Sequence, residues 1–157
     1  MTNKMDFIDK NILVSGSTNG IGWSSAKQFA ERGGNVTLAS RNIELLKQRF
    51  STLFNNGNQK HHIIPLDFSK PIELEQSLKE FISKNSIEYD VVINNTGGPP
   101  GGALENAHTE DLLSALNLHL ISFHKILGPT LPGMKNKESG RIVNIISTSV
   151  RQPLNGL

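Results

Sequence analysis

The chain has 157 residues, 36% of them hydrophobic, and its 16 basic and 14 acidic side chains leave a net charge of +2. That length is enough for one domain with a buried core, and the balanced charge, without a basic block, argues against nucleic acid as a partner. The absence of cysteine excludes disulfides and thiolate chemistry. No apolar run is long enough to span a membrane and no secretory signal is visible, so we expect a cytoplasmic protein.

The first elements of the chain are predicted to be a strand and a helix. Residues 11–15 form a short apolar run that stops at a glycine, which is typical of a buried strand. Residues 20–32 have helical spacing, end before two glycines, and place Ile21, Ser25 and Phe29 on one face.

The next part of the chain repeats this alternation. Residues 35–39 predict a second strand, and Asn42 can cap a second helix whose apolar residues share a face. Residues 61–66 predict a short third strand, which its histidines and proline place near a sheet edge. A third helix is expected to open at Pro71, and residues 89–94 predict a fourth strand.

A glycine- and proline-rich segment, residues 97–102, interrupts the pattern and predicts a loop, either a lid beside the site or a plain connection. Thr109 can cap a long helix that Pro129 and Pro132 are expected to end. Residues 141–146 predict a fifth strand. The predicted inward face of the long helix consists of Leu112, Leu116, Leu120, Phe123 and Leu127.

The alternation of five strands with four helices predicts one parallel sheet with helices on both faces. Because crossovers are right-handed, few topologies remain. We expect the doubly wound strand order 3-2-1-4-5 of a Rossmann-type α/β fold, truncated after the fifth strand and therefore without its usual sixth. Residues 1–157 are then a single dinucleotide-binding domain.

The strongest motif is the run Ser-Gly-Ser-Thr-Asn-Gly-Ile-Gly between the first strand and the first helix. Its first glycine allows a sharp turn, its second allows a pyrophosphate to approach the backbone, and its third lets the helix pack close to the sheet. The N–H groups at the helix start suit phosphates. The motif predicts a dinucleotide site, rather than only a tight turn, that contains Gly16, Ser17, Thr18, Asn19, Gly20, Ile21 and Gly22.

The end of the second strand indicates which dinucleotide binds. An acidic residue there would favour NAD by accepting hydrogen bonds from the ribose 2′-hydroxyl, but this chain has Ser40 followed by Arg41. A guanidinium suits a 2′-phosphate in charge and geometry, and the hydroxyls of Ser40 and Thr18 could add contacts. We therefore expect NADP, with NAD as the second choice. The same pair argues against a methyltransferase, which would prefer an acidic residue at this position.

Several motifs, in the right order, resemble the short-chain dehydrogenase/reductase family, and an atypical 3-oxoacyl-carrier-protein reductase in particular. The glycine spacing G-x-x-x-G-x-G, the segment Asn-Asn-Thr-Gly at residues 94–97, and the strand at 141–147 that ends in a serine are all similar to that family's motifs. The resemblance implies that Asp67, Asn94 and Gly97 bind the cofactor. It also implies catalytic roles for Asn117, which would order a water, and for Ser147, which would hold the substrate oxygen.

One departure from the family pattern bears on activity. The family's proton donor is a Tyr followed four residues later by a Lys, on the helix after the fifth strand, and this pair is missing here. The resemblance thus implies the N-terminal part of a longer reductase, either a fragment or a natural truncation. We expect NADP(H)-dependent carbonyl reduction or alcohol oxidation on a small molecule, impaired in this chain. A non-catalytic dinucleotide-binding or regulatory module is the alternative.

The remaining expectations concern metals and partners. His61 and His62 lack a third ligand at a usable spacing, so no metal site is expected. His119 and His124 are expected to be solvated surface residues outside the site. The helix at 109–127 carries apolar residues on more than one face, which predicts a homo-oligomer that associates through this helix.

Overall fold

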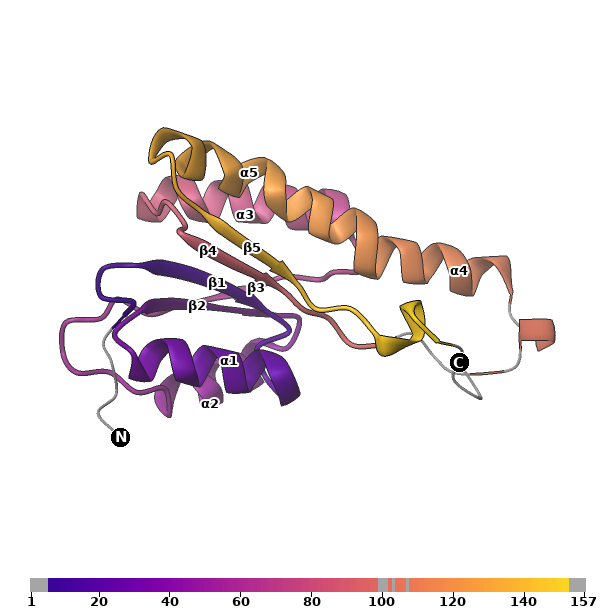
Figure 1. The fold of residues 1–157 in the computed structure, drawn as a ribbon, viewed down its shortest axis with the longest axis horizontal. Helices are drawn as coiled ribbons and strands as arrows, with labels where there is room; N and C mark the ends of the chain where they lie inside the picture. The colour runs from indigo at the N-terminus through magenta and orange to yellow at the C-terminus, as the bar shows by residue number, and fades with distance from the viewer. Residues whose placement is uncertain (1–5, 99–101, 103, 107, 153–157) are drawn as a thin grey trace.

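The computed structural model describes residues 6–98, 102, 104–106 and 108–152. Within these residues, five strands form one parallel sheet in the order β3-β2-β1-β4-β5, which confirms the predicted fold class and strand order (Figure 1). The short β3 lies at one edge, as expected, and β5 lies at the other. The strands are β1 (Asn11–Ser15), β2 (Asn35–Ser40), β3 (His62–Pro65), β4 (Val91–Asn94) and β5 (Arg141–Asn144).

Helices cover both faces of the sheet and make a three-layer molecule. Helices α1 and α2 lie on one face, and α3 and α5 lie on the other (Figure 1). A single π-helical turn, η2, joins α4 to α5. The helices are α1 (Gly20–Glu31), α2 (Ile43–Ser51), α3 (Pro71–Asn85), α4 (Thr109–Leu116), η2 (Asn117–Ile121) and α5 (Ser122–Asn136), with short 3-10 turns η1 (Leu104–Asn106) and η3 (Thr148–Val150).

The core consists of two apolar clusters, one on each side of the sheet. In β1, Leu13 belongs to the cluster under α3 and α5, whereas Ile12 and Val14 belong to the cluster under α1 and α2. All three side chains are fully buried. Because both faces of a doubly wound sheet are covered, its central strands are continuous apolar runs, which is why this strand could be predicted to the residue.

Helix α1 packs on the sheet through small residues. Its buried residues, Gly22, Ala26 and Ala30, are spaced by four. Of the predicted face, Phe29 packs partly buried against the core, whereas Ile21 is 59% exposed. A Cβ added to Gly22 would collide with the carbonyl oxygen of Gly16. The helix therefore lies so close to the glycine loop that larger side chains must point away from the sheet.

Helix α5 contains Pro129 and Pro132, so the prediction that they end the long helix is wrong. An interior proline costs roughly 3 kcal/mol or more. The burial of Ile126 and Met134 in the core offsets this cost, at about 1.5–3 kcal/mol per large apolar side chain. The hydroxyl of Thr130 also donates to the carbonyl oxygen of Ile126 at 2.9 Å. Packing against α3 thus outweighs the local preference of proline.

Helix α4 extends past the end of the sheet and has little beneath it (Figure 1). The predicted inward positions Leu112, Leu116 and Leu120 are 55%, 49% and 60% exposed, so this part of the prediction is also wrong. Phe123, one turn further on, is buried. The N-cap position is His108 rather than Thr109, and the His108 N–H donates to Oδ2 of Asp111 at 3.2 Å.

Two further features complete the fold. The centre of the predicted glycine–proline loop, residues 99–101, lies outside the described residues. Among the residues that are described, no helix combines the length and apolar character needed to cross a membrane.

Candidate functional site

The predicted site residues gather where the parallel strands end. The glycine loop follows β1, Ser40 ends β2, and Asn94 ends β4. Since β1 pairs with both β2 and β4 in parallel, these three chain segments leave the sheet at the same edge. Ligands of open α/β sheets bind in the crevice outside such carboxyl ends, so the topology makes this edge the candidate site.

The glycine loop has the backbone that its sequence predicts. Gly16 and Gly20 have positive φ angles of 56° and 53°, a region that L side chains rarely adopt. A Cβ on Gly16 would lie 2.6 Å from Nδ2 of Asn95, whereas a Cβ on Gly20 would meet nothing within 4 Å. The protein itself therefore requires glycine at position 16 for space. At Gly20 the space beside the backbone is open, as a loop that accepts a phosphate needs.

Two loop residues fasten the glycine loop to β2. The backbone N–H and the hydroxyl of Ser17 both reach the carbonyl oxygen of Ala39, each at 3.3 Å, and the Ser17 side chain is fully buried. Oγ1 of Thr18 lies 3.4 Å from Oγ of Ser40. Ser17 is thus an internal anchor of the loop, and Thr18 and Ser40 form a hydroxyl pair at the end of β2.

The end of β2 brings a cation close to a carboxylate. Oδ1 of Asp67 accepts hydrogen bonds from the hydroxyl and the N–H of Ser69, at 2.7 and 3.0 Å. The Ser69 hydroxyl, together with the nearby charges of Arg41 and Lys70, holds the pKa of Asp67 below its usual value. Arg41 itself is exposed and free of any side-chain hydrogen bond among the described residues. Its guanidinium is therefore accessible to an anion.

The segment after β4 links that strand to its neighbours. The side chain of Asn94 is fully buried and donates to Oδ1 of Asn144 on β5 at 2.8 Å. The side-chain amide of Asn95 donates to the carbonyl oxygen of Gly16 at 3.3 Å, and its N–H donates to the Ser15 hydroxyl at 2.8 Å. Asn94 thus ties β4 to β5, and Asn95 ties β4 to the glycine loop. Cofactor contacts by Asn94 and Gly97 remain predictions.

The helix residue that reaches the end of β4 is His119. Its Nδ1 lies 2.7 Å from Oγ1 of Thr96, and its buried Nε2 has no hydrogen-bond partner within the described part of the chain. Burial lowers the pKa of this imidazole, which favours the neutral ring. The expectation that His119 is a solvated surface residue is therefore wrong. Asn117 lies two residues earlier in the same π-helical turn, and its catalytic role remains a prediction.

Ser147 follows β5 and opens the 3-10 turn η3. Its Oγ accepts hydrogen bonds from the N–H and from the hydroxyl of Ser149, at 3.1 and 2.7 Å. A serine hydroxyl has two acceptor positions and one donor, so both acceptor positions are filled and the O–H remains free to donate. That donor suits a carbonyl or alkoxide oxygen, but the catalytic role of Ser147 remains a prediction.

Arg49 is a residue of this region that the sequence did not single out. It lies on α2, yet its Nε donates to the carbonyl oxygen of Thr18 at 2.7 Å and its Nη2 donates to Oδ1 of Asn19 at 3.0 Å. The guanidinium also lies over the ring of Trp23, 5.1 Å from the ring centroid. No local pattern could have revealed these contacts, because they join residues 26 to 31 positions apart in the chain.

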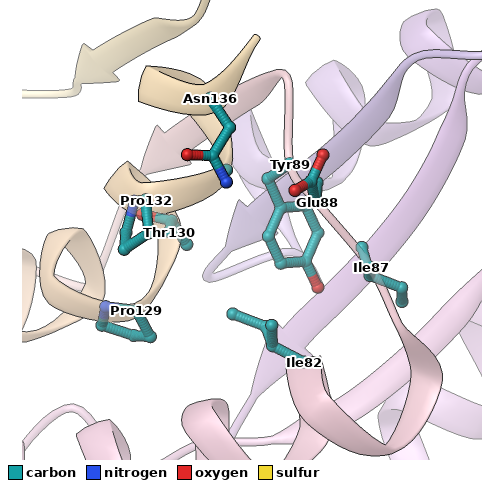
Figure 2. Close-up of a pocket in the computed structure, with 9 residues that line it drawn as sticks. Ile82, Ile87, Glu88, Tyr89, Pro129, Thr130, Pro132 and Asn136 are labelled. Atoms are coloured by element: carbon teal, nitrogen blue, oxygen red, sulfur yellow. The ribbon is translucent and has the colours of Figure 1, made fainter.

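One pocket lies away from this edge of the sheet. It has a volume of about 180 Å³ and is formed by the end of α3, the segment before β4, and α5 (Figure 2). Tyr89, the only tyrosine of the chain, lines it at the amino end of β4 and donates from its hydroxyl to Oγ1 of Thr37 at 3.1 Å. Burial raises the pKa of Tyr89. This tyrosine is therefore a core residue at the wrong end of the sheet to serve the candidate site.

Comparison with known sequences gives consistent relatives. A family model described as short chain dehydrogenase matches residues 10–157. Hydroxysteroid dehydrogenase-like protein 1 of Gallus gallus is 33% identical over 143 residues, which are 90% of this chain and 43% of that protein. The 3-oxoacyl-[acyl-carrier-protein] reductase FabG of Chlamydia trachomatis is 30% identical over 141 residues, 89% of this chain and 56% of the reductase. The chain thus spans about half the length of these curated relatives.

Solved structures share the fold. L-sorbose reductase from Gluconobacter frateurii, in complex with NADPH and L-sorbose, superposes with a TM-score of 0.89 at 23% identity. The match covers 98% of this chain and 58% of that one. An Escherichia coli oxidoreductase, yciK, superposes with a TM-score of 0.86 at 25% identity, covering 98% of this chain and 64% of the other.

Proposed function

Because the chain belongs to the short-chain dehydrogenase family, we propose that it binds a nicotinamide dinucleotide and serves the reduction of a carbonyl or the oxidation of an alcohol on a small molecule. The related proteins include 3-oxoacyl-[acyl-carrier-protein] reductases, which is consistent with a carbonyl substrate. We place this activity in the cytoplasm. We also propose that copies of the chain associate through the exposed leucines of α4.

The observation that carries this proposal is the glycine loop at the carboxyl end of β1. Gly20 has a positive φ and open space where a Cβ would project, and the N-cap residue Asn19 makes no capping hydrogen bond to α1. The first turn of a helix has N–H groups without intrahelical partners, and these groups bind phosphates. The residues present therefore fit a pyrophosphate held between the loop and the start of α1.

The end of β2 favours NADP(H) over NAD(H). Arg41 supplies an accessible guanidinium, and the hydroxyl pair of Thr18 and Ser40 lies beside the loop. One cation and two hydroxyls suit a 2′-phosphate, and an acidic residue that would repel it is absent from this strand end. Asp67, with Oδ2 still available, would bind the adenine.

Near the nicotinamide, the protein's own residues would orient the substrate and bind or transfer protons. The bound nicotinamide would supply or accept the hydride. Ser147 would donate its free O–H to the substrate oxygen, because both of its acceptor positions are already filled by Ser149. A donor placed in this way stabilises negative charge as it develops on that oxygen. Asn117 would order a water for the proton relay, as the family resemblance implies.

The test is a pair of measurements on the 157-residue chain. Calorimetric titration with NADPH should show binding, and failure to bind would overturn the proposal. Oxidation of NADPH with a panel of ketones and aldehydes should be slow or undetectable. The chain's only tyrosine is buried at the far end of the sheet, and a missing general acid costs about 10²–10⁴-fold. Robust turnover that is lost in Ser147→Ala would show that another residue donates the proton.

A non-catalytic dinucleotide-binding module is the second candidate. The hydrogen bond between the hydroxyls of Ser147 and Ser149 favours this candidate, because an ordinary surface turn without a catalytic role would contain the same hydrogen bond. Binding of NADPH together with no turnover in a chain that supplies the family's Tyr–Lys pair would support this candidate.

A further inference from the structure

Asn19 and Asn42 are both N-cap residues, but their side chains behave differently. Asn42 caps α2 in the usual way, since its Oδ1 accepts a hydrogen bond from the N–H of Leu45 at 3.0 Å. Asn19 has the extended backbone of an N-cap residue, with φ −147° and ψ 172°, yet its side chain makes no capping hydrogen bond to α1. Asparagine is among the most favourable N-cap residues, so the absence of this cap needs a cause.

The side-chain oxygen of Asn19 is bound to Arg49 instead. Nη2 of Arg49 donates to Oδ1 of Asn19, the same oxygen that would otherwise cap α1. The guanidinium is fixed in place by its Nε, which donates to the Thr18 carbonyl oxygen, and by the Trp23 ring beneath it. Arg49 is half-buried. A charged donor held by two other contacts competes well for an amide oxygen, because charge-assisted hydrogen bonds are the stronger ones.

While Oδ1 of Asn19 is bound to Arg49, the start of α1 has no side-chain cap. A capping oxygen would accept from the N–H of Ile21 or Gly22, the second and third residues of α1. A phosphate at a helix N-terminus uses these same N–H groups. Cap and phosphate are therefore mutually exclusive partners, and a capped helix would bind phosphate more weakly.

We propose that Arg49 is a positioning residue for the cofactor: it holds the Asn19 side chain away from the start of α1, so that the N–H groups there stay free for the pyrophosphate. This inference rests on the proposed dinucleotide binding. It assigns to α2 a role in phosphate binding that is separate from the charge of Arg41.

Calorimetry on two single variants and their combination tests the proposal. Arg49→Met removes the donors but keeps the length of the side chain, and it frees Asn19 to cap α1. NADPH binding should weaken about fivefold, which corresponds to the strength of one asparagine cap. Asn19→Ala alone, at a residue of the proposed site, provides the reference affinity against which the double variant is compared. The double variant Arg49→Met/Asn19→Ala should regain most of the loss, because the competing oxygen is gone.

Recovery in the double variant separates the proposal from a simple charge effect. If Arg49 acted only as a cation near the phosphates, removal of Asn19 would restore nothing, and that result would overturn the proposal. Lys47→Met, which removes an exposed positive charge from the same helix, controls for net charge and should change the affinity less than twofold.

Hydrogen exchange of the chain without cofactor gives an independent readout. The amides of Ile21 and Gly22 should exchange more slowly in Arg49→Met than in the unaltered chain, and the protection should disappear in the double variant. Unchanged exchange in Arg49→Met would contradict the proposal even if NADPH affinity fell. If the unaltered chain failed to bind NADPH, the proposed function would fall, whereas the exchange data would still decide the relation between Arg49 and Asn19.

Discussion

The hydroxyl of Thr96 and the imidazole of His119 lie 2.7 Å apart and join the segment after β4 to the π-helical turn η2. Either the hydroxyl donates to Nδ1, and Nε2 carries the ring proton, or Nδ1 donates to the hydroxyl, and Nε2 is an acceptor. In both cases Nε2 keeps one unused hydrogen-bonding position. A buried polar atom without a partner costs about 1–3 kcal/mol, so this position is suited to receive a polar group of a ligand or a water.

His119 should titrate below the ordinary histidine value. Burial disfavours the charged ring and lowers its pKa from 6.5, so the imidazole is neutral at pH 7. A proton NMR titration of the ring should give a midpoint below 6.5, and nitrogen shifts should show one dominant tautomer. Thr96→Val should weaken that tautomer preference. A midpoint at or above 6.5 would contradict the buried placement of this ring.

Stability should fall as the pH drops below about 6.5, with His61 as one cause. The Nδ1 of His61 accepts from the N–H of Val36 at 3.0 Å, and Nε2 lies 2.9 Å from the carbonyl oxygen of Phe54. Burial is the main cause that lowers the pKa of His61. The unfolded chain therefore takes up the proton first, and the contribution of His61 is complete above the unfolded pKa and lost as the pH falls through the folded one.

Urea unfolding at several pH values checks this sign. His61→Gln, which cannot titrate, should reduce the slope of unfolding free energy against pH between about pH 7 and 5, even if it lowers stability throughout. The pKa of His62 is also lowered by burial, so part of the slope should persist. An identical slope in the variant would show that His61 plays no part.

Gly20→Val should abolish dinucleotide binding while the chain stays folded. A Cβ at Gly20 meets no protein atom within 4 Å, so the cost to folding is mainly the positive φ, about 1–2 kcal/mol. The same side chain would fill the space that a pyrophosphate needs. Gly57→Val is a matched control, because Gly57 also has a positive φ and open space around it. Equal NADPH affinity of the two folded variants would show that the phosphate loop is misplaced.

Arg41→Ala should weaken NADPH binding and leave NADH binding nearly unchanged, because only NADPH carries a 2′-phosphate for the guanidinium to bind. A charge-assisted contact of this kind contributes about 1.5–3 kcal/mol, which predicts roughly a tenfold loss or more. Lys47→Ala removes the same charge from an exposed position nearby and should affect neither cofactor. Equal losses for NADPH and NADH would contradict the assignment of Arg41.

Association should depend on the exposed leucines of α4 and η2. Leu112, Leu116 and Leu120 are about half exposed, and a contiguous apolar surface of this kind typically marks an interface. Sedimentation at micromolar concentration should show a dimer or larger assembly, and the triple serine variant should be a monomer. Ile72→Ser, at an even more exposed isoleucine of α3, should leave the assembly intact. A monomeric unaltered chain would remove the basis of this prediction.

The extent to which sequence predicts this molecule differs between its elements. The central strand β1 could be predicted to the residue because it is apolar on both faces and followed by a motif. The buried face of α1 could not, because its closeness to the sheet selects Gly22, Ala26 and Ala30, whereas apolar size alone pointed to their neighbours. Likewise, nothing in the pattern around Leu112 and Leu116 reveals that the sheet stops before it reaches them.

The functional edge was predictable where its residues form local motifs. The glycine loop, Ser40 and Arg41 are each recognisable within a few neighbouring positions. Arg49 and His119 were missed because their significance lies in partners far along the chain, Asn19 and Thr96. A half-exposed arginine and a helix histidine are common surface residues, and only the packing of α2 and η2 against the loops distinguishes them.

The close fit between the glycine loop and the segment after β4 couples the positions of these two segments. Asn95 binds the Ser15 hydroxyl and the Gly16 carbonyl oxygen, and even a single methyl group on Gly16 would strike it. Because close-packed regions transmit strain, a shift of one of these two segments should also move the other. A dinucleotide settling against the first loop would therefore also fix Thr96, one residue beyond Asn95. The contact between Thr96 and His119 would then be set together with the glycine loop, so that one ligand would order both segments.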